Sequence, residues 1–310
     1  MGKIIFLVGP TGIGKTEVSF HLAKMLGAEI VSCDSMQVYK EADIINAKPP
    51  QEFLYEIPHH LVNIVSVEEE FNVARFYELA QRAVDDILSR GTIPLCVGGS
   101  GLYYSILLEG IFSFSYEDKE LRRSLREEAH MHGGYYLHNK LSKVDPQSAK
   151  RIHPHDLRRI IRALEVFYLS GKTLSEIRTQ RRGLSSRYKV KVLGLIASRP
   201  YIYERINQRT EDMFRRGLVE EVKNLLGKNL SHTFKQIIGF SQVKDFLEGK
   251  ITLDEAKSQM KKLTRRFAKR QLTWFRHDKK ISWVNIEDFP SFLEISQYIH
   301  SHIIRHGKRT

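Results

Sequence analysis

The stretch that decides the fold is GPTGIGKT, Gly9 to Thr16, which matches the phosphate-binding loop pattern G-x-x-x-x-G-K-[ST]. The apolar run KIIFLVG precedes the loop, and TEVSFHLAKML, with apolar residues at helical spacing, follows it. In this strand, loop and helix order, backbone N–H groups and the positive end of the helix surround an anion. Lys15 would reach the terminal phosphate and Thr16 a Mg²⁺ ion. The pattern recognises phosphate oxygens and leaves open which molecule carries them.

Two further strand-like runs lead to polar residues. AEIVSCDS ends with Asp34 and Ser35, and TIPLCVGG opens the glycine turn GGSG, which contains Ser100. A fourth run, YKVKVLGLIA, lies near residues 188 to 197. Strands that alternate with helices predict an α/β fold, here a P-loop NTPase-like parallel sheet flanked by helices. Because parallel strands end at one edge, we expect Asp34 and Ser100 to face the same crevice as Lys15.

The pattern divides the chain into three segments. We expect the first part of the P-loop core over residues 1–113 and a helical insertion over 114–155. The remainder of the core and a basic, helical C-terminal region follow over 156–310. Asp156 can cap a helix with an apolar stripe of Leu157, Ile161, Leu164 and Tyr168. The arginines that lie away from this stripe are Arg158, Arg159 and Arg162.

The charge balance points to a polyanionic partner. Lys and Arg number 49 against 36 Asp and Glu, a net charge of +13. Residues 261–280 hold nine Lys or Arg and one Asp, which favours contact with a nucleic-acid backbone over a merely solvated helix. In this helix we expect Leu263, Phe267 and Trp274 to contact the core. The basic residues expected on its surface are Lys262, Arg265, Arg266, Lys269, Arg270 and Arg276.

Composition excludes several classes of protein. Cys33 and Cys96 lie in apolar runs, as expected of buried free thiols in a reducing compartment. No apolar run approaches the length of a membrane span, so we expect a cytoplasmic protein. The 13 histidines form no zinc-binding set.

Asp34 permits three interpretations from its position alone. A carboxylate at the end of a buried strand can bind a metal, act as a general base, or cap the next turn. Its expected convergence with the loop on one edge of the sheet favours a functional role.

The motifs together resemble those of the tRNA dimethylallyltransferase family, also called tRNA isopentenyltransferases, over almost the whole chain. They occur in family order: GPTGIGKT, DSMQVY, NAKP, IPHHLVNI, GGSGLY, DPQSAKRIHPHDLRRIIRALEVF, ERINQRTEDMFRRGLVEEV, QIIGF and TRRFAKRQLTWFR. A phosphate loop alone is shared by many unrelated enzymes, whereas this series is specific.

The resemblance implies transfer of a dimethylallyl group from dimethylallyl diphosphate to N6 of adenosine 37, beside the tRNA anticodon. The catalytic residues it implies are Asp34 as general base, Lys15, and Ser100, where the family usually has threonine. It assigns the diphosphate to Gly9, Pro10, Thr11, Gly12, Ile13, Gly14, Lys15 and Thr16. It assigns tRNA contacts to Asp34, Ser35, Met36, Gln37, Arg158, Arg159, Ile160, Ile161 and Arg162.

Other expectations extend this assignment. Arg199 and Arg205, near the end of the fourth strand, are further candidates for diphosphate contacts, and Thr16 for Mg²⁺. Arg266 and Arg270 on the basic helix, together with the insertion, would clasp the anticodon stem-loop while the target base is flipped out of its stack. We expect a monomer.

Three alternatives share these features. A small-molecule or nucleotide kinase would bind ATP in the loop and consume it, whereas the transferase needs none. An enzyme that prenylates free AMP or ATP would have less need of the basic helix. A nucleotide-switched RNA-binding protein would carry out no transfer, and the convergence of Asp34 and Ser100 on the loop argues against it.

Overall fold

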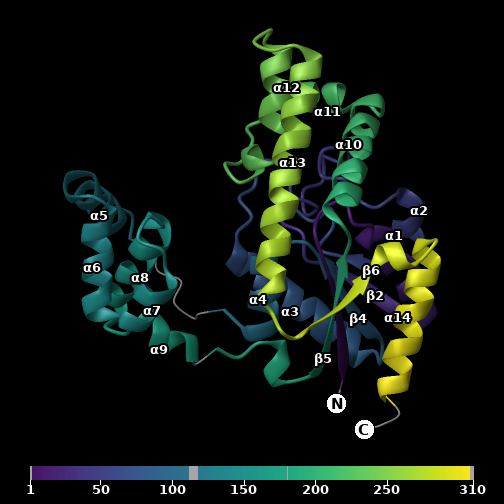
Figure 1. Cartoon of the computed structure of the whole chain (residues 1–310), viewed down its shortest axis with the longest axis horizontal. Helices are drawn as coiled ribbons and strands as arrows, with labels where there is room; N and C mark the ends of the chain where they lie inside the picture. Colours follow the sequence, from purple (N-terminus) through teal and green to yellow (C-terminus); the bar gives the residue numbers. More distant parts are fainter. Residues whose placement is uncertain (1, 112–117, 180, 308–310) are drawn as a thin grey trace. The chain divides into compact units, whose positions relative to one another are not determined.

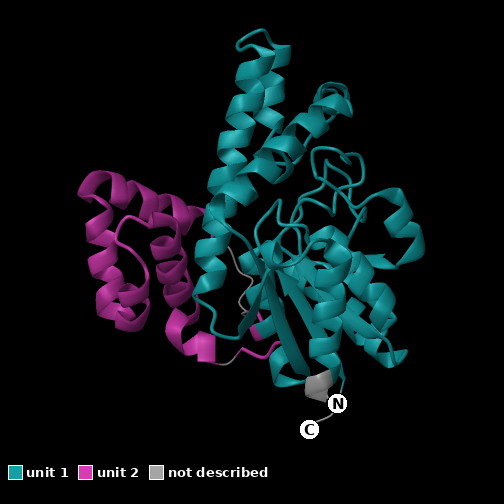
Figure 2. Ribbon diagram, turned by 45° about the vertical axis from the view of Figure 1, so that its right-hand side comes forward, with its two compact units in different colours: residues 1–108, 184–310 teal, residues 109–183 magenta. Residues whose placement is uncertain are grey.

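A computed structural model of the chain describes residues 2–111, 118–179 and 181–307, with side chains to residue 304. The residues fall into two compact units, 1–108 with 184–310, and 109–183 (Figure 2). The expected start of the insertion, at residue 114, lies outside the described residues.

The larger unit is built on a sheet of six parallel strands in the order β3-β2-β4-β1-β5-β6 (Figure 1). This confirms the predicted α/β, P-loop-like class. Three predicted strands and the late fourth strand are present, whereas β3 and β6 were not predicted because they are short or follow the basic helix. The strands are β1 Lys3–Val8, β2 Ala28–Ser32, β3 His59–His60, β4 Ile93–Gly98, β5 Lys189–Ile196 and β6 Ile281–Asn285.

Helices cover both faces of the sheet, and β1 is therefore buried on both sides. Ile5 and Leu7 of β1 pack in one cluster with α1 and α14, while Ile4 and Phe6 pack in another with α3 and α4. The helices of this unit are α1 Lys15–Leu26, α2 Gln51–Glu56, α3 Val73–Ser89, α4 Gly101–Glu109, α10 Arg199–Arg215, α11 Leu218–Leu226, α12 Phe240–Leu247, α13 Leu253–Arg276 and α14 Phe292–Gly307. Its 3₁₀ turns are η1 Leu184–Ser186, η2 Phe234–Gln236 and η3 Ile286–Asp288.

The smaller unit is helical and has its own core. Its helices are α5 Lys119–His132, α6 Gly134–Val144, α7 Pro146–Arg151, α8 Leu157–Ser170 and α9 Leu174–Thr179. The unit extends to residue 183, whereas the sequence placed its end at 155. The reason is that Ile161 and Leu164 of α8 pack against Leu125 of α5 and Leu137 of α6, so α8 belongs to this core and not to the sheet domain.

The topology positions the site. In the order β2-β4-β1, the turn after β4 lies between the segment after β2 and the loop after β1. The end of β4 and the segment after β2 are so close that a Cβ on Gly98 would lie 2.2 Å from the carbonyl oxygen of Cys33. Asp34, Ser100 and Lys15 therefore follow three adjacent strand ends, as expected of a ligand edge in a parallel sheet.

Candidate active site

The phosphate loop has the backbone that its glycines permit. Gly14 has φ +98° and is the N-cap of α1, and a Cβ there would lie 2.3 Å from the Phe292 ring. Lys15 folds back over the loop, where its Nζ donates hydrogen bonds to the carbonyl oxygens of Gly9, at 3.0 Å, and Pro10, at 2.8 Å. The Ile13 side chain is fully buried in the core, so only its backbone faces a ligand in the loop.

Two arginines from α10 reach the same loop. The Nε of Arg205 donates to the carbonyl oxygen of Gly12 at 2.9 Å. One turn later, a terminal nitrogen of Arg209 donates to the Thr11 hydroxyl at 2.9 Å. The structure thus brings Arg205, a candidate for diphosphate contacts, to the loop, and adds Arg209, which was not predicted from the sequence.

Burial shapes the charges at this loop. It lowers the pKa of Lys15 to about 8, and the positive charge of Arg209 acts in the same direction. Burial also lowers the pKa of Arg209. The carboxylate of Asp34 opposes both shifts, which means that its field reaches the Lys15 ammonium and the Arg209 guanidinium. The loop, two cations and one carboxylate form a single electrostatic unit.

Asp34 begins a turn, and one of its oxygens is engaged there. Its Oδ1 accepts a hydrogen bond from the backbone N–H of Met36 at 2.9 Å, the capping role considered from the sequence. A carboxylate offers about four acceptor positions, so this bond is compatible with a further role. The adjacent phenol of Tyr103 also feels this charge, because burial first and the Asp34 carboxylate second raise the pKa of Tyr103.

Ser100 lies at the start of α4, in the turn between the loop and Asp34. Its hydroxyl accepts the backbone N–H of Tyr103 at 3.4 Å, and its carbonyl oxygen accepts that of Tyr104 at 3.0 Å. On either side of Ser100, Gly99 and Gly101 are packed against α13: an added Cβ would lie 2.4 Å from the Gln271 side chain or from the Trp274 ring, respectively. This close packing was not predicted from the sequence.

The segment after Asp34 is tied into the larger unit. The Gln37 side chain accepts from the Ser32 hydroxyl at 2.9 Å and donates to the carbonyl oxygen of Ala47 at 3.4 Å. Ser35 and Met36 are half-buried between these anchors. Direct hydrogen bonds therefore hold this segment beside the Asp34 turn.

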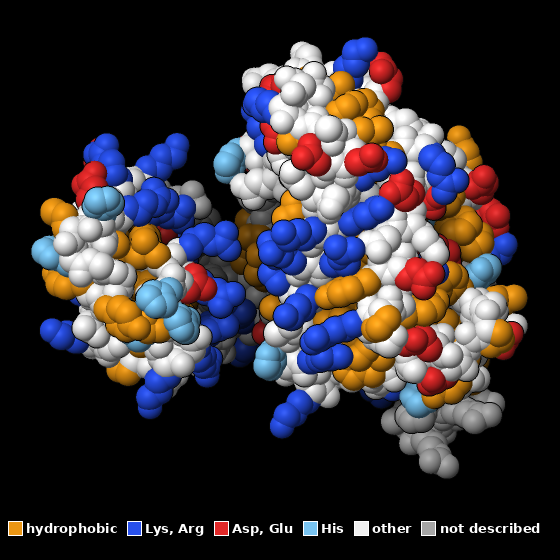
Figure 3. Space-filling view, turned by 45° about the horizontal axis from the view of Figure 1, so that its top comes forward, with side chains coloured by type: hydrophobic (Ala, Val, Ile, Leu, Met, Phe, Trp, Pro, Cys, Tyr) orange, Lys and Arg blue, Asp and Glu red, His pale blue; other side chains and the backbone are white. Residues whose placement is uncertain are grey.

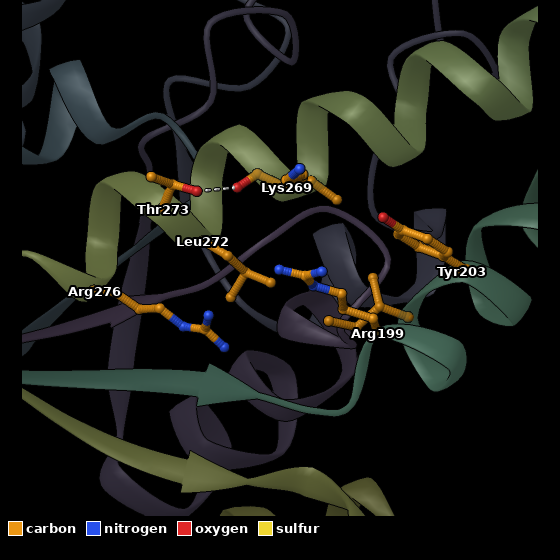
Figure 4. Close-up of a pocket in the computed structure, with 8 residues that line it drawn as sticks. Arg199, Tyr203, Lys269, Leu272, Thr273 and Arg276 are labelled. Atoms are coloured by element: carbon orange, nitrogen blue, oxygen red, sulfur yellow. Dashed lines mark hydrogen bonds between the residues drawn. The ribbon is translucent and has the colours of Figure 1, made fainter.

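Arg199 does not join the phosphate loop. It lines a small pocket between α10 and α13 (Figure 4). None of the residues that line this pocket belongs to the phosphate loop. Arg199 is the first residue of α10, whereas Arg205 and Arg209, which contact the loop, lie further along the helix. The lining residues are Arg199, Ile202, Tyr203, Ala268, Lys269, Leu272, Thr273 and Arg276.

The buried face of the basic helix α13 agrees only in part with the predicted one. Trp274 contacts the buried Tyr104 ring edge to face, with 5.8 Å between ring centroids, as expected of a core contact. Phe267 and Trp274 are 37% and 38% exposed. The helix instead buries Met260, Thr264, Ala268, Gln271, Leu272 and Phe275. Trp274 nevertheless packs its ring against Gly101, while the buried face also carries Thr264 and Gln271, polar residues that the prediction did not place there. Exposed Lys and Arg side chains gather on one face of the larger unit (Figure 3); those of α13 are Lys262, Arg266, Lys269, Arg270 and Arg276.

In the smaller unit, α8 separates its arginines from its isoleucines. Ile160 and Ile161 are 0% and 5% exposed in the core of the unit, so the expected RNA contacts of these two side chains are not supported. Arg158 and Arg159 are exposed. Arg162 pairs with the buried carboxylate of Glu165 at 2.6 Å. The isoleucines anchor the helix and the arginines lie on its outer surface.

Two kinds of feature are absent from the described residues. None of their helices is long and apolar enough to cross a membrane. They also contain no group of three or more His, Cys, Asp or Glu side chains placed to hold a metal ion. This does not conflict with magnesium at a phosphate site, where the ion takes most of its ligands from phosphate and water.

A glycine loop between the central strand and its helix, with a lysine folded over it, defines a P-loop type of phosphate-binding protein. Comparison with known proteins is more specific. The family model "IPP transferase" matches residues 37–278, and "Isopentenyl transferase" matches residues 2–60. The chain belongs to the IPP transferase family, and is a transferase.

Its relatives cover almost the whole chain. A tRNA dimethylallyltransferase of Geobacillus thermodenitrificans is 44% identical over 96% of both chains. The crystal structure of the tRNA isopentenylpyrophosphate transferase of Bacillus halodurans is 37% identical, covers 99% of both chains and has a TM-score of 0.70. A eukaryotic dimethylallyltransferase acting on tRNA is 31% identical, covers 92% of this chain and 74% of its own, and has a TM-score of 0.75.

Proposed function

We propose that the protein transfers a dimethylallyl group from dimethylallyl diphosphate to N6 of adenosine 37 in tRNA. The observation that carries the proposal is that Asp34, Ser100 and Lys15 follow the ends of the adjacent strands β2, β4 and β1. The Asp34 carboxylate accordingly lies within the field of Lys15 and Arg209. The proposed base would thus lie beside the proposed diphosphate cradle, which is what alkyl transfer from a diphosphate requires. Family membership and the tRNA-modifying names of the relatives support the same reaction.

The proposed step forms one bond and breaks one. The N6 lone pair forms the C–N bond to C1 of the dimethylallyl group, while the C1–O bond breaks and its electron pair leaves with diphosphate. An adenine amino group is a poor nucleophile, so acceptance of its proton by Asp34 would contribute about 10²- to 10⁴-fold. Ser100, beside Asp34 at the next strand end, is proposed to contact the reacting group with its hydroxyl.

The charge that develops on the leaving diphosphate would be stabilised by the loop. Its backbone N–H groups, Lys15, Arg205 and Arg209 supply donors and positive charge where that charge forms. The Thr16 hydroxyl would hold a Mg²⁺ ion, which adds positive charge beside the diphosphate oxygens. We do not extend the diphosphate contacts to Arg199, which lines the separate pocket between α10 and α13.

We propose that tRNA is bound through phosphate contacts in both units. In the smaller unit the exposed Arg158 and Arg159 of α8 are the candidates, with Arg162 held by Glu165. In the larger unit the candidates are Arg266 and Arg270 of α13. Asp34 to Gln37 would contact the flipped nucleotide near the catalytic carboxylate.

The decisive experiment incubates the protein with labelled dimethylallyl diphosphate and unmodified tRNA, with Mg²⁺, with and without ATP. Label is expected in tRNA without ATP, and at the adenosine beside the anticodon after nuclease digestion. Label only in added AMP or ATP would indicate a prenyltransferase of free nucleotides. Phosphate transfer that needs ATP would indicate a kinase, and neither outcome is compatible with the proposal.

Two further features belong to this proposal. We propose that the protein acts as a monomer, since one chain carries the loop, both loop arginines and Asp34. We also place it in the cytoplasm, where unmodified tRNA is available. Sedimentation of the protein with and without tRNA tests the first, and fractionation of cells tests the second.

A further inference from the structure

A glutamine on the basic helix connects the two segments that carry the proposed chemistry. Gln271 lies on the inner face of α13 and is 8% exposed. Its Oε1 accepts the backbone N–H of Thr11, in the phosphate loop, at 2.8 Å. Its Nε2 donates to the carbonyl oxygen of Gly99, in the turn that leads to Ser100, at 2.9 Å. One side-chain amide thus links segments that are 88 positions apart in sequence (99 − 11).

The packing leaves this amide little freedom. Ala268 and Phe275, one turn before and after Gln271 on α13, are buried at 1% and 0% exposure. A Cβ on Gly99 would lie 2.4 Å from the Gln271 Nε2 and 3.2 Å from the Gly9 carbonyl oxygen. The close approach of turn, loop and glutamine therefore requires glycine at position 99. Both ends of the amide are satisfied in a buried place, where an unpaired polar group is costly.

We propose that Gln271 is a positioning residue, which fixes the phosphate loop relative to the Ser100 turn and so sets the distance between diphosphate and acceptor. The proposal rests on the proposed function for the reaction itself. The physical basis of the proposal is that the Thr11 N–H belongs to the backbone of the phosphate loop. The hydrogen bond from Thr11 to Gln271 therefore also orients the backbone amides that follow Thr11. A displacement of about 1 Å between reacting groups can cost about 100-fold in rate.

The test compares two glutamine-to-methionine variants. Gln271→Met keeps the approximate size of the side chain and removes both hydrogen bonds. Gln242→Met is the matched control, because Gln242 is also 8% exposed and its Oε1 likewise accepts one backbone N–H, that of Gly239, at 2.9 Å. Gln242 contributes no hydrogen bond to the loop or to the turn at 99. Both variants should lose similar thermal stability.

Only Gln271→Met is expected to impair the site. Its kcat/KM for transfer should fall about 10- to 100-fold, its Kd for inorganic pyrophosphate should rise about fivefold or more, and its Kd for tRNA should change less than twofold. Gln242→Met should keep all three within about twofold of wild type. The inference is wrong if Gln271→Met also stays within twofold in transfer and pyrophosphate binding, or if the control loses as much.

A charged variant separates positioning from packing. When the carboxyl group introduced by Gln271→Glu is protonated, it has one donor and one acceptor and can replace both hydrogen bonds. When it is ionised, it has no donor and its negative charge repels a diphosphate. Its pyrophosphate Kd, divided by that of wild type at the same pH, should therefore approach one as the pH falls from 8 to 5. The same ratio for Gln271→Met should stay high and constant. A ratio for Gln271→Glu that does not change with pH would contradict the inference.

The two proposals fail differently. If wild-type protein moves no label into tRNA, the proposed function is wrong. Pyrophosphate binding by the same variants still tests Gln271, because that measurement involves neither tRNA nor prenyl transfer.

Discussion

The titration of Lys15 gives a prediction whose sign and size follow from the structure. Burial and the charge of Arg209 lower the pKa of Lys15 to about 8. A diphosphate in the loop favours the charged ammonium, so binding above this pH must take up a proton. With a pKa of about 8, Lys15 is about 90% charged at pH 7 and about 10% charged at pH 9. The affinity for diphosphate should therefore fall as the pH rises through 8, and Kd should increase about tenfold between pH 7 and 9.

Calorimetric titration of dimethylallyl diphosphate without tRNA measures this effect, since no transfer can occur. The terminal phosphate, whose last pKa is about 6, stays ionised throughout this range. Repeating the titration at pH 9 in buffers of different ionisation enthalpy measures the number of protons taken up when the ligand binds. This number is expected to approach one per bound ligand. Lys15→Met is the control, with weak binding that does not vary with pH. A wild-type Kd that is constant from pH 7 to 9, or a tenfold change retained in Lys15→Met, would refute the reasoning.

Three variants test the remaining parts. Asp34→Asn should lower the rate of single-turnover transfer about 10²- to 10⁴-fold, while tRNA affinity, measured by filter binding, stays within about twofold. Near-normal turnover would exclude Asp34 as the base. Gly99→Ala should cost about 1–3 kcal/mol in urea unfolding, because its Cβ meets the Gln271 amide, and an unchanged midpoint would contradict that contact. Arg266→Ala combined with Arg270→Ala should reduce the slope of log K against log salt for tRNA by about 1.5, whereas an unchanged slope would remove both from the RNA surface.

The local parts of the site could be predicted from the sequence. The phosphate loop depends on left-handed glycines and on a lysine at a fixed offset, which are properties of consecutive residues. The placement of Asp34 and Ser100 at neighbouring strand ends followed from the rule that parallel strands end at one edge. The structure confirms that fold and that edge, although the strand order itself comes from tertiary pairing.

The faces of the helices could not be predicted in the same way. In α13 the prediction buried Phe267 and Trp274 because they are large and apolar, yet both remain more than a third exposed. The inner face instead includes Gln271, whose amide donates a hydrogen bond to the carbonyl oxygen of Gly99, while Trp274 packs its ring against Gly101 and stays partly exposed. Helical periodicity gives the spacing of a buried stripe, and the partner surface selects which stripe is buried.

The sequence by itself determined the phosphate loop, the parallel sheet and the specific family motifs, because these depend on short-range backbone conformation and residue order. Tertiary structure alone decided that Arg209 joins the loop, that Tyr103 lies in the field of Asp34 and that Gln271 links the loop to the Ser100 turn. It also decided that α8 belongs to the smaller unit. Arginine, tyrosine and glutamine are common residues without a local signature, and their roles arise only when distant segments are packed together.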